Sequence, residues 1–395
     1  MKAFLRKIFS IDHVIVSAMS LSVVGAFAFM VFNISFLNPI ARGLSGFSMS
    51  NIYYSIINDE VKPPRNELIT IVDMTELHKR EQLASVLDDI HDMQPVAIGV
   101  DVIFEGYKGD IEGNALLTDT YFNMGEDVVT AVKLADYNAE KGVYERKIRS
   151  FFVEDGVPVT EGCVNLFNGP EKTVQSYPVY QLCQEDTIST LPARMAMMVG
   201  EDVPTYRHLM DIHYKPDSFA IVSWRDIAAN RDLIEGHIVL FGTTQEENDM
   251  HYTPVGKIPG VEVIAYATQT MIDHFDITRQ SRLSAILWTL LVCVLVNISN
   301  FFFASWLKRK NNFTRMLDEW TLIYSFHTFF WMTLVTWITF LLFIRADYYA
   351  DTVLLLSSLA LMTPCRYFYV AFIHYLEKTV HWKFLQRSIY SLSNK

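Results

Sequence analysis

Four apolar stretches limit the fold more strongly than any other feature of this 395-residue sequence. They cover residues 13–37, 283–307, 320–344 and 349–373. Each holds the roughly 20 predominantly apolar residues that a helix needs to cross a bilayer. The sequence therefore predicts four transmembrane helices, one before and three after the polar segment 38–280.

The first and the fourth of these stretches each have a feature that is unusual for a simple membrane span. The first could be a cleaved signal peptide with processing near Ala26 and Ala28, but its apolar run continues to Leu37. Because the apolar part of a signal peptide is usually shorter, an uncleaved anchor is favoured. The fourth stretch contains Asp351 and Arg366. We expect Arg366 near the far interface, where its long stem lets the charge reach water.

Basic residues beside the apolar stretches predict the orientation of the chain, because Lys and Arg accumulate on the cytoplasmic side. The three basic groups are Lys2, Arg6 and Lys7; Lys308, Arg309, Lys310 and Arg315; and Lys378, Lys383 and Arg387. Residues 1–12 and 374–395 are therefore predicted to be cytoplasmic, and 38–280 to form one extracytoplasmic domain.

The predicted outside domain is strongly acidic. Residues 38–280 hold 38 acidic and 19 basic side chains, a net charge of −19. Such a domain is a poor binder of nucleic acid and of anionic lipid headgroups. Cationic ligands or metal ions suit it electrostatically, although a solvated acidic surface is the more common reason for such a balance.

The four cysteines fall into two pairs. Cys293 and Cys365 lie in predicted spans, where a thiol acts as a small apolar group. Cys163 and Cys183 lie in the outside domain, where an oxidising compartment favours a disulfide that would add about 3 kcal/mol of stability. Two unpaired thiols are the alternative. No metal-type CxxC spacing is present.

Strand and helix patterns alternate through the outside domain. Apolar runs predict strands at 68–73, 95–104, 127–133, 218–224 and 237–242. Helical periodicity predicts a helix between the first two strands, capped by Thr75, and helices at 114–124, 191–199 and 260–275. A juxtamembrane helix is predicted near 47–57, and residues 137–190 read as an irregular insertion. The alternation predicts an α/β domain with a mainly parallel sheet.

Three carboxylates hold similar positions relative to this sheet. Asp73 and Asp101 stand at the ends of strands, and Asp249 follows the loop after 237–242. Ligands of parallel sheets bind beyond the carboxyl ends of the strands. The three acids could hold a cation or bind an amine by charge-assisted hydrogen bonds. Gly242 would permit a close backbone approach, and Thr243 and Thr244 would add hydroxyl and amide groups.

Each candidate also has a structural reading. An Asp after a buried strand often caps a helix or orders a turn, and this alternative is slightly favoured for all three. Arg80 either pairs with one of the acids or is exposed. His251 lies two residues after Asp249, a spacing that weakly suggests a metal loop, but a solvated histidine is favoured. Trp224 is expected to pack.

Catalysis finds little support. The sequence has no nucleophile elbow, no glycine-rich phosphate loop and no HExxH, and the Gly-Thr-Thr after residue 241 lacks the lysine of a phosphate-binding loop. We expect no cofactor and no enzymatic activity. A hydrolase that uses the three acids remains the least favoured alternative.

Residues of three ordered motifs resemble the second type of CHASE domain (cyclase and histidine-kinase associated sensory extracellular). The first motif is Ile69, Ile71, Val72 and Asp73, with Arg80 after it; the second is Ala97-Ile98-Gly99-Val100-Asp101-Val102-Ile103-Phe104; the third is Ile238, Val239, Leu240, Gly242, Thr243, Thr244, Asp249, Thr253, Pro254 and Pro259-Gly260-Val261-Glu262. The resemblance covers about 45–275. Two departures are that Ile264-Ala265 replaces a frequent His-Ala pair, and that a tryptophan-rich signature around the first helix is missing.

The resemblance implies a periplasmic sensor in the inner membrane of a double-membrane bacterium, with a small molecule or a protein as its ligand. Output modules of the family usually follow the last span, whereas here only 377–395 remain. A signal would then pass through the helices or an amphipathic tail to a separate output protein. A homodimer is left open. The main alternative is a structural or docking subunit of a membrane assembly.

Overall fold

A computed structural model describes residues 7–33, 54, 65–166, 173–203, 209–214, 218–275, 277–310, 321–380 and 388–391. The chain divides into two compact units: Met1–Leu44 with Ile277–Lys395, and Ser45–Asp276. The predicted juxtamembrane helix near 47–57 lies outside the described residues except for Tyr54.

The unit Ser45–Asp276 is built on one large sheet. Of the described strands, nine form it, in the order β10-β1-β11-β2-β3-β4-β7-β8, with β5 beside β3. Their bounds are β1 Arg65–Asp73, β2 Ala97–Val100, β3 Val128–Asn138, β4 Val143–Ile148, β5 Thr160–Cys163, β7 Tyr180–Cys183, β8 Asp186–Ser189, β10 Ser218–Ser223 and β11 Ile238–Gly242. The pairs from β10 to β3 are parallel, as are β3–β5 and β4–β7, whereas β3–β4 and β7–β8 are antiparallel. The predicted mainly parallel α/β fold is confirmed.

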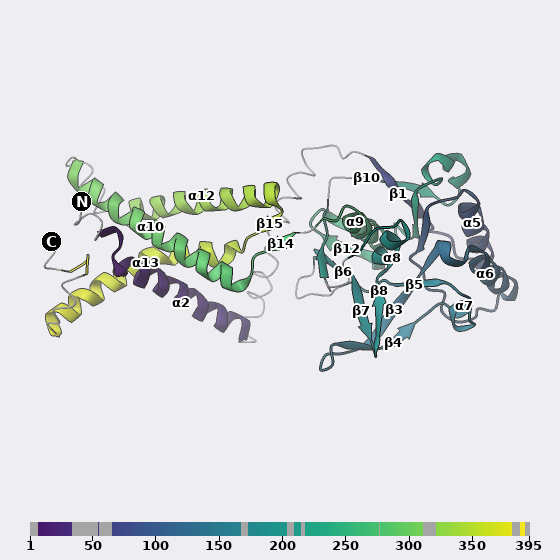
Figure 1. The fold of residues 1–395 in the computed structure, drawn as a ribbon, viewed down its shortest axis with the longest axis horizontal. Coiled ribbons are helices and arrows are strands. Elements are labelled where there is room, and N and C mark those ends of the chain that lie inside the picture. Colours follow the sequence, from purple (N-terminus) through teal and green to yellow (C-terminus); the bar gives the residue numbers. More distant parts are fainter. Residues whose placement is uncertain are drawn as a thin grey trace. The chain divides into compact units, whose positions relative to one another are not determined.

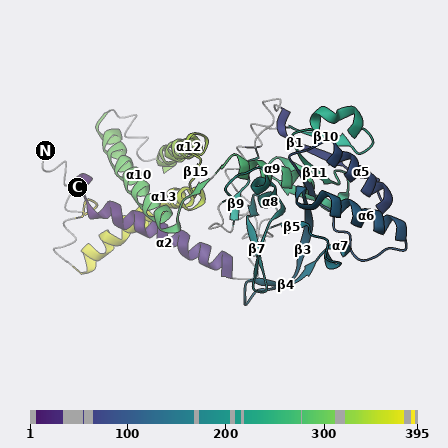
Figure 2. The ribbon, with the colours of Figure 1, turned by 45° about the vertical axis from the view of Figure 1, so that its right-hand side comes forward.

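Helices cover both faces of the parallel part of the sheet (Figures 1 and 2). Side chains alternate between the faces along a strand. Val72 and Phe241 accordingly belong to one core with α5 (Arg80–Asp92) and α6 (Ile111–Met124). Ile71 and Leu240 belong to the other core, with α8 (Leu191–Met198) and α9 (Gly260–Ile272). Burial on both faces explains why these strands read as continuous apolar runs.

Two local predictions are corrected. The first helix begins at Arg80 with Lys79 at its N-cap, whereas Thr75 lies in the preceding turn and donates a hydrogen bond to Asp73. The segment 137–190 is more regular than predicted. It contains the end of β3 and strands β4 to β8, including the short β6 (Ser176–Pro178), with the short helix α7 (Phe151–Glu154). Short strands with polar faces give little periodic signal, which explains the error.

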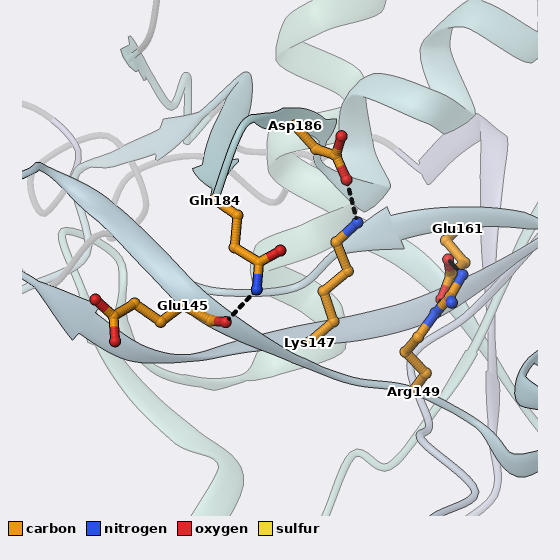
Figure 3. Close-up of polar contacts among 6 residues, drawn as sticks. All are labelled: Glu145, Lys147, Arg149, Glu161, Gln184 and Asp186. Atoms are coloured by element: carbon orange, nitrogen blue, oxygen red, sulfur yellow. Dashed lines mark hydrogen bonds and ion pairs between the residues drawn. The ribbon is translucent and has the colours of Figure 1, made fainter.

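Polar contacts join the antiparallel part of the sheet (Figure 3). Lys147 on β4 forms an ion pair with Asp186 on β8, with Nζ 2.8 Å from Oδ2. The Gln184 amide donates to the Glu145 carbonyl oxygen at 2.8 Å. Arg149 pairs with Glu161 on β5, its Nε donating to Oε1 at 2.8 Å. The first two contacts link β4 to β8 and to the turn between β7 and β8, where β4 and β7 share a single backbone pair, and the third links the residue after β4 to β5.

Cys163 and Cys183 are free thiols in the structure, which corrects the predicted disulfide. Cys163 and Cys183 are both buried in one apolar cluster with Val132 and Leu134. The Cys163 thiol lies 3.3 Å from Oδ1 of Asn165. Burial raises the pKa of Cys163 to about 12. These thiols therefore act as small core side chains.

The other unit contains four long helices: α2 (Ile11–Asn33), α10 (Arg282–Lys310), α12 (Thr321–Ala346) and α13 (Thr352–Thr379). All four are long and apolar enough to cross a membrane. Helix α2 packs against α10 and α13, and α12 packs against α13 (Figure 1). The four predicted spans are thus found as helices, with ends that differ by a few residues where both ends are described.

A buried carboxylate connects the beginning of α2 with the C-terminal residues. Asp12 is only 2% exposed. It accepts hydrogen bonds from Ser10 Oγ at 2.6 Å, Tyr369 Oη at 2.7 Å and the backbone amide of Ile389 at 2.8 Å. The segment 388–391 thus packs into the helix bundle. The predicted amphipathic tail helix falls mainly on 381–387, which lie outside the described residues.

Candidate functional site

The candidate site lies where three neighbouring parallel strands end. In the sheet β11 stands between β1 and β2, and the last residues of β1 and β11, Asp73 and Gly242, are paired. Asp101 directly follows β2, and its amide donates to the Phe241 carbonyl oxygen at 2.9 Å. Both aspartates therefore stand at the carboxyl edge of the sheet, as predicted.

Asp101 and Asp249 come together at this edge, beside the beginning of α9. A Cβ at Gly242 would lie 3.5 Å from Asp101 Cβ and 2.9 Å from a methyl group of Val261 in α9. A Cβ at Gly260 would lie 2.8 Å from Asp249 Oδ1. Glycine at these two positions is what allows the strand, the helix and the Asp249 carboxylate to approach so closely. An anion at a helix N-terminus is also electrostatically favoured.

Two further side chains interact electrostatically with this pair of acids. Nε2 of His251, on β12 (Met250–Thr253), lies 3.6 Å from Asp249 Oδ1. Tyr177, on β6, is 1% exposed, and its hydroxyl finds no hydrogen-bond partner among the described residues. The charge of Asp101 acts on this phenol. A buried donor without an acceptor costs about 1–3 kcal/mol and points to a ligand or a water molecule at this place.

The environment keeps about half of Asp101 protonated near neutral pH. Burial raises its pKa to about 7, the negative charge of Asp249 adds to the rise, and His251 opposes it. Part of the residue's surface still faces solvent, but the surrounding protein deprives the carboxylate of most of its hydration. Glu262, in the first turn of α9, also has a pKa raised by burial.

Asp73 has a different role, although it ends β1 at the same edge of the sheet. Its Oδ1 accepts hydrogen bonds from the Thr75 amide at 3.0 Å, the Thr75 hydroxyl and the Thr244 amide at 3.1 Å. Gln245 Nε2 lies 3.4 Å from the second carboxylate oxygen. Burial alone would raise the pKa of Asp73, but these hydrogen bonds outweigh it and hold the pKa below its ordinary value. Asp73 therefore joins two loops.

Arg80 does not join the acids, which corrects the candidate ligand site. It is 2% exposed and lies over the Phe151 ring at 4.6 Å. Its guanidinium donates to the Gly106 carbonyl oxygen at 2.7 Å and to Asn114. Arg80 therefore holds the loop between β2 and α6, and neither of the predicted alternatives, an acid partner or full exposure, is correct.

Thr243, Thr244 and Trp224 also lie within the described residues. Thr244 contributes its backbone amide to Asp73, and Thr243 is half-buried between Gly242 and Thr244. Trp224 packs against the core on the α5 side, as expected. Across the ranges that the structure describes, no group of three or more His, Cys, Asp or Glu side chains is arranged to hold a metal.

Sequence reasoning missed Tyr177 as a member of this site. The residue lies within 137–190, where no regular structure was predicted, and β6 pairs with β9 (Leu209–Asp211) outside the large sheet. Nothing local in the sequence places its hydroxyl near Asp101. Only the tertiary fold brings the two side chains close.

The fold and the site define a sheet domain whose carboxyl edge lies beside α9, in a chain that also carries four candidate membrane helices. A family model described as "CHASE2 domain" matches residues 42–299, and the chain belongs to this family. Comparisons with curated proteins and with solved structures gave no match. Membership of a sensory family, together with the four apolar helices, indicates a membrane sensor.

Proposed function

We propose that the edge formed by Asp101, Asp249, His251 and Tyr177 receives a small cationic ligand, such as a primary amine. The supporting observation is the pairing of two carboxylates, of which Asp101 has a raised pKa and no side-chain hydrogen bond among the described residues. An ammonium group would stabilise the ionised form of Asp101 by a charge-assisted hydrogen bond. The net charge of −19 over 38–280 would concentrate cations nearby.

The proposal includes the placement of the chain. The domain would face the periplasm, and both termini the cytoplasm, of an inner-membrane protein. The basic residues beside the apolar stretches support this orientation. A separate output protein, and a homodimer as the signalling form, belong to the same proposal.

The signal would leave the site through α9. This helix begins at Gly260 beside Asp249 and ends at Ile272, and the next helix along the chain, α10, begins at Arg282. A ligand can bias two conformations only by its different affinity for them. A cation between Asp101 and Asp249 removes their repulsion and so favours a closed arrangement of the β11–α9 loop.

Thermal unfolding of the full-length protein in detergent tests the ligand proposal. The probes are putrescine and ethanolamine, with CaCl2 as a test for a metal. We expect an amine to raise the Tm of the wild type, and Asp101→Asn and Asp249→Asn to abolish the shift. Asp232→Asn, which changes an exposed aspartate elsewhere, is the matched control and keeps it. Equal shifts in all four proteins, or none in the wild type, would refute amine binding at this edge.

Labelling with an impermeant maleimide tests the orientation. All four native cysteines are buried, so the background is low. Asp232→Cys should react in intact spheroplasts, and Lys378→Cys only after permeabilisation, since both positions are exposed. The reverse pattern would place the domain in the cytoplasm. Purification in mild detergent separates sensing from docking: a stoichiometric protein partner without any amine response supports a docking subunit.

A further inference from the structure

A buried arginine in the helix bundle has no anionic partner among the residues that the structure describes. Arg366, on α13, is 8% exposed. Its guanidinium carbon lies 4.8 Å from the ring centre of Tyr324 and 5.6 Å from that of Tyr367. Within the described part of the chain, Arg366 makes no hydrogen bond, and no carboxylate lies within 4.0 Å of it. A charge within a membrane helix is costly unless it meets an opposite charge or a polar cavity.

One neighbour of Arg366 provides a second hydrogen-bond donor that has no acceptor among the described residues. Its charge acts on His327 of α12 and on Tyr390. The ring nitrogens of His327 already face Asn300 Oδ1 at 2.5 Å and Ser299 Oγ at 3.3 Å. The Tyr390 hydroxyl, in contrast, is buried without a hydrogen-bond partner among the described residues. Arg366 and Tyr390 thus offer hydrogen-bond donors that lack an acceptor.

The Asp12 carboxylate in this region already accepts hydrogen bonds from other groups. Asp12 also acts electrostatically on Tyr390, but its oxygens accept from Ser10, Tyr369 and the Ile389 amide. The Asp12 carboxylate therefore binds groups other than Arg366. The fork of N–H groups on the guanidinium stays available for the oxygens of another anion.

Arg366 lies at the level of one end of α12, and this position suits an anion at the membrane interface. Its aromatic partner Tyr324 lies in the first turn of α12, which begins at Thr321, so Arg366 stands at the level where this helix starts. Lys308, Arg309 and Lys310 end α10, and Arg315 follows in the sequence before α12. Basic sites near one end of a helix bundle are typical binding sites of anionic lipid headgroups.

We propose that Arg366 and the Tyr390 hydroxyl bind a phosphate group, supplied by an anionic lipid headgroup or by free phosphate. The planar guanidinium takes two phosphate oxygens and the phenol a third. This site is independent of the ligand edge in the sheet domain. It also gives the C-terminal segment 388–391 a reason to pack into the bundle, since Tyr390 completes the site.

The test compares the Tm of the full-length protein in nanodiscs of phosphatidylcholine, of phosphatidylcholine mixed with phosphatidylglycerol, and of phosphatidylcholine with added inorganic phosphate. We expect the anionic lipid to raise the Tm of the wild type by several degrees. A similar rise with inorganic phosphate would identify free phosphate as a source of the same chemistry. No rise under either condition overturns the proposal.

Substitutions test whether the rise in Tm depends on Arg366 and Tyr390. Arg366→Gln should lose the response to the anionic lipid, and Arg366→Lys should keep only part of it, because the ammonium lacks the planar fork. Arg345→Gln, an exposed arginine near the other end of α12, is the matched control and should respond like the wild type. If Arg366→Gln does not fold, Tyr390→Phe decides the question, because it removes one donor and should reduce the response. An unchanged response in Arg366→Gln, or in Tyr390→Phe and Arg366→Lys together, overturns the proposal.

Discussion

Asp73 and Asp101 stand at the same edge of one sheet, at the ends of β1 and β2 on either side of β11, yet their surroundings give them opposite properties. Asp73 accepts hydrogen bonds from Thr75 and Thr244, and its pKa is lowered. Asp101 lacks such donors, faces Asp249, and has its pKa raised to about 7. The difference shows that position at a strand end does not decide the role of an acid. A carboxylate to which the fold already supplies hydrogen-bond donors has a structural role. A carboxylate without such donors is left for a ligand, as we propose for Asp101.

The largest effect is expected from Asp73→Ala. The substitution leaves the Thr75 amide without its acceptor in a partly buried turn, and leaves the Thr244 amide with only the Thr75 hydroxyl oxygen at 3.2 Å. Each unsatisfied buried donor costs about 1–3 kcal/mol, so the free energy of unfolding should fall by about 2 kcal/mol or more. Denaturant unfolding measures this loss. Asp73→Asn keeps one acceptor oxygen and should cost clearly less; equal losses would contradict the hydrogen-bond account.

Asp101→Asn should act in the opposite direction. Because the folded-state pKa of Asp101, about 7, lies above the unfolded value of about 4, the folded wild type loses stability as pH rises through this window. The amide variant cannot ionise and escapes this loss. Its Tm should match the wild type near pH 4 and exceed it by roughly 3–6 °C near pH 8. Parallel Tm curves for the two proteins would show that Asp101 does not titrate in this window.

Smaller and opposed shifts are expected from the neighbours of Asp101. Asp249→Asn removes a negative charge that raises the pKa of Asp101, and His251→Ala removes a group that lowers it. The pH at which stability stops falling should therefore move down in the first variant and up in the second. Thermal melts across the pH range measure both. Movement in the same direction would exclude the proposed electrostatic coupling.

The smallest effect is expected at the antiparallel side of the sheet. Lys147→Ala removes the ion pair with Asp186, whose side chain is 66% exposed. Exposed pairs contribute about 0–1 kcal/mol, so unfolding should change by no more than about 0.5 kcal/mol. The same variant serves as a control for the pH experiments, since it lies away from the acid pair. A large loss would mean that this pair fixes the position of β4.

Much of the parallel fold could be predicted from sequence because burial on both sides leaves a strong signal. The runs at 68–73 and 237–242 are nearly continuous in apolar residues, and both are strands: β1 begins three residues before the predicted start, and β11 begins one residue after it. The segment 137–190 could not be predicted in the same way. Its strands are short, and β4 and β8 carry many exposed polar side chains.

The candidate site was predictable in part. The positions of Asp73 and Asp101 follow from the rule that parallel strands end at one edge. Which acids meet was not predictable, because it depends on hydrogen bonds of turns and on the close approach of α9 at Gly242 and Gly260. Arg80 shows the same limit. Its partners, Gly106 and Asn114, come from the loop and helix after β2, which no local pattern connects to it.

The hydrogen bond from the Ile389 amide to Asp12 has a practical consequence for any recombinant form of this protein. A truncation before residue 388 would strip the carboxylate of one donor and uncover polar atoms inside an apolar bundle. A bulky fusion placed directly after Ser391 would strain the same junction. Affinity handles are therefore safer on an exposed turn of the sheet domain, such as the one between β3 and β4, than at the carboxyl terminus.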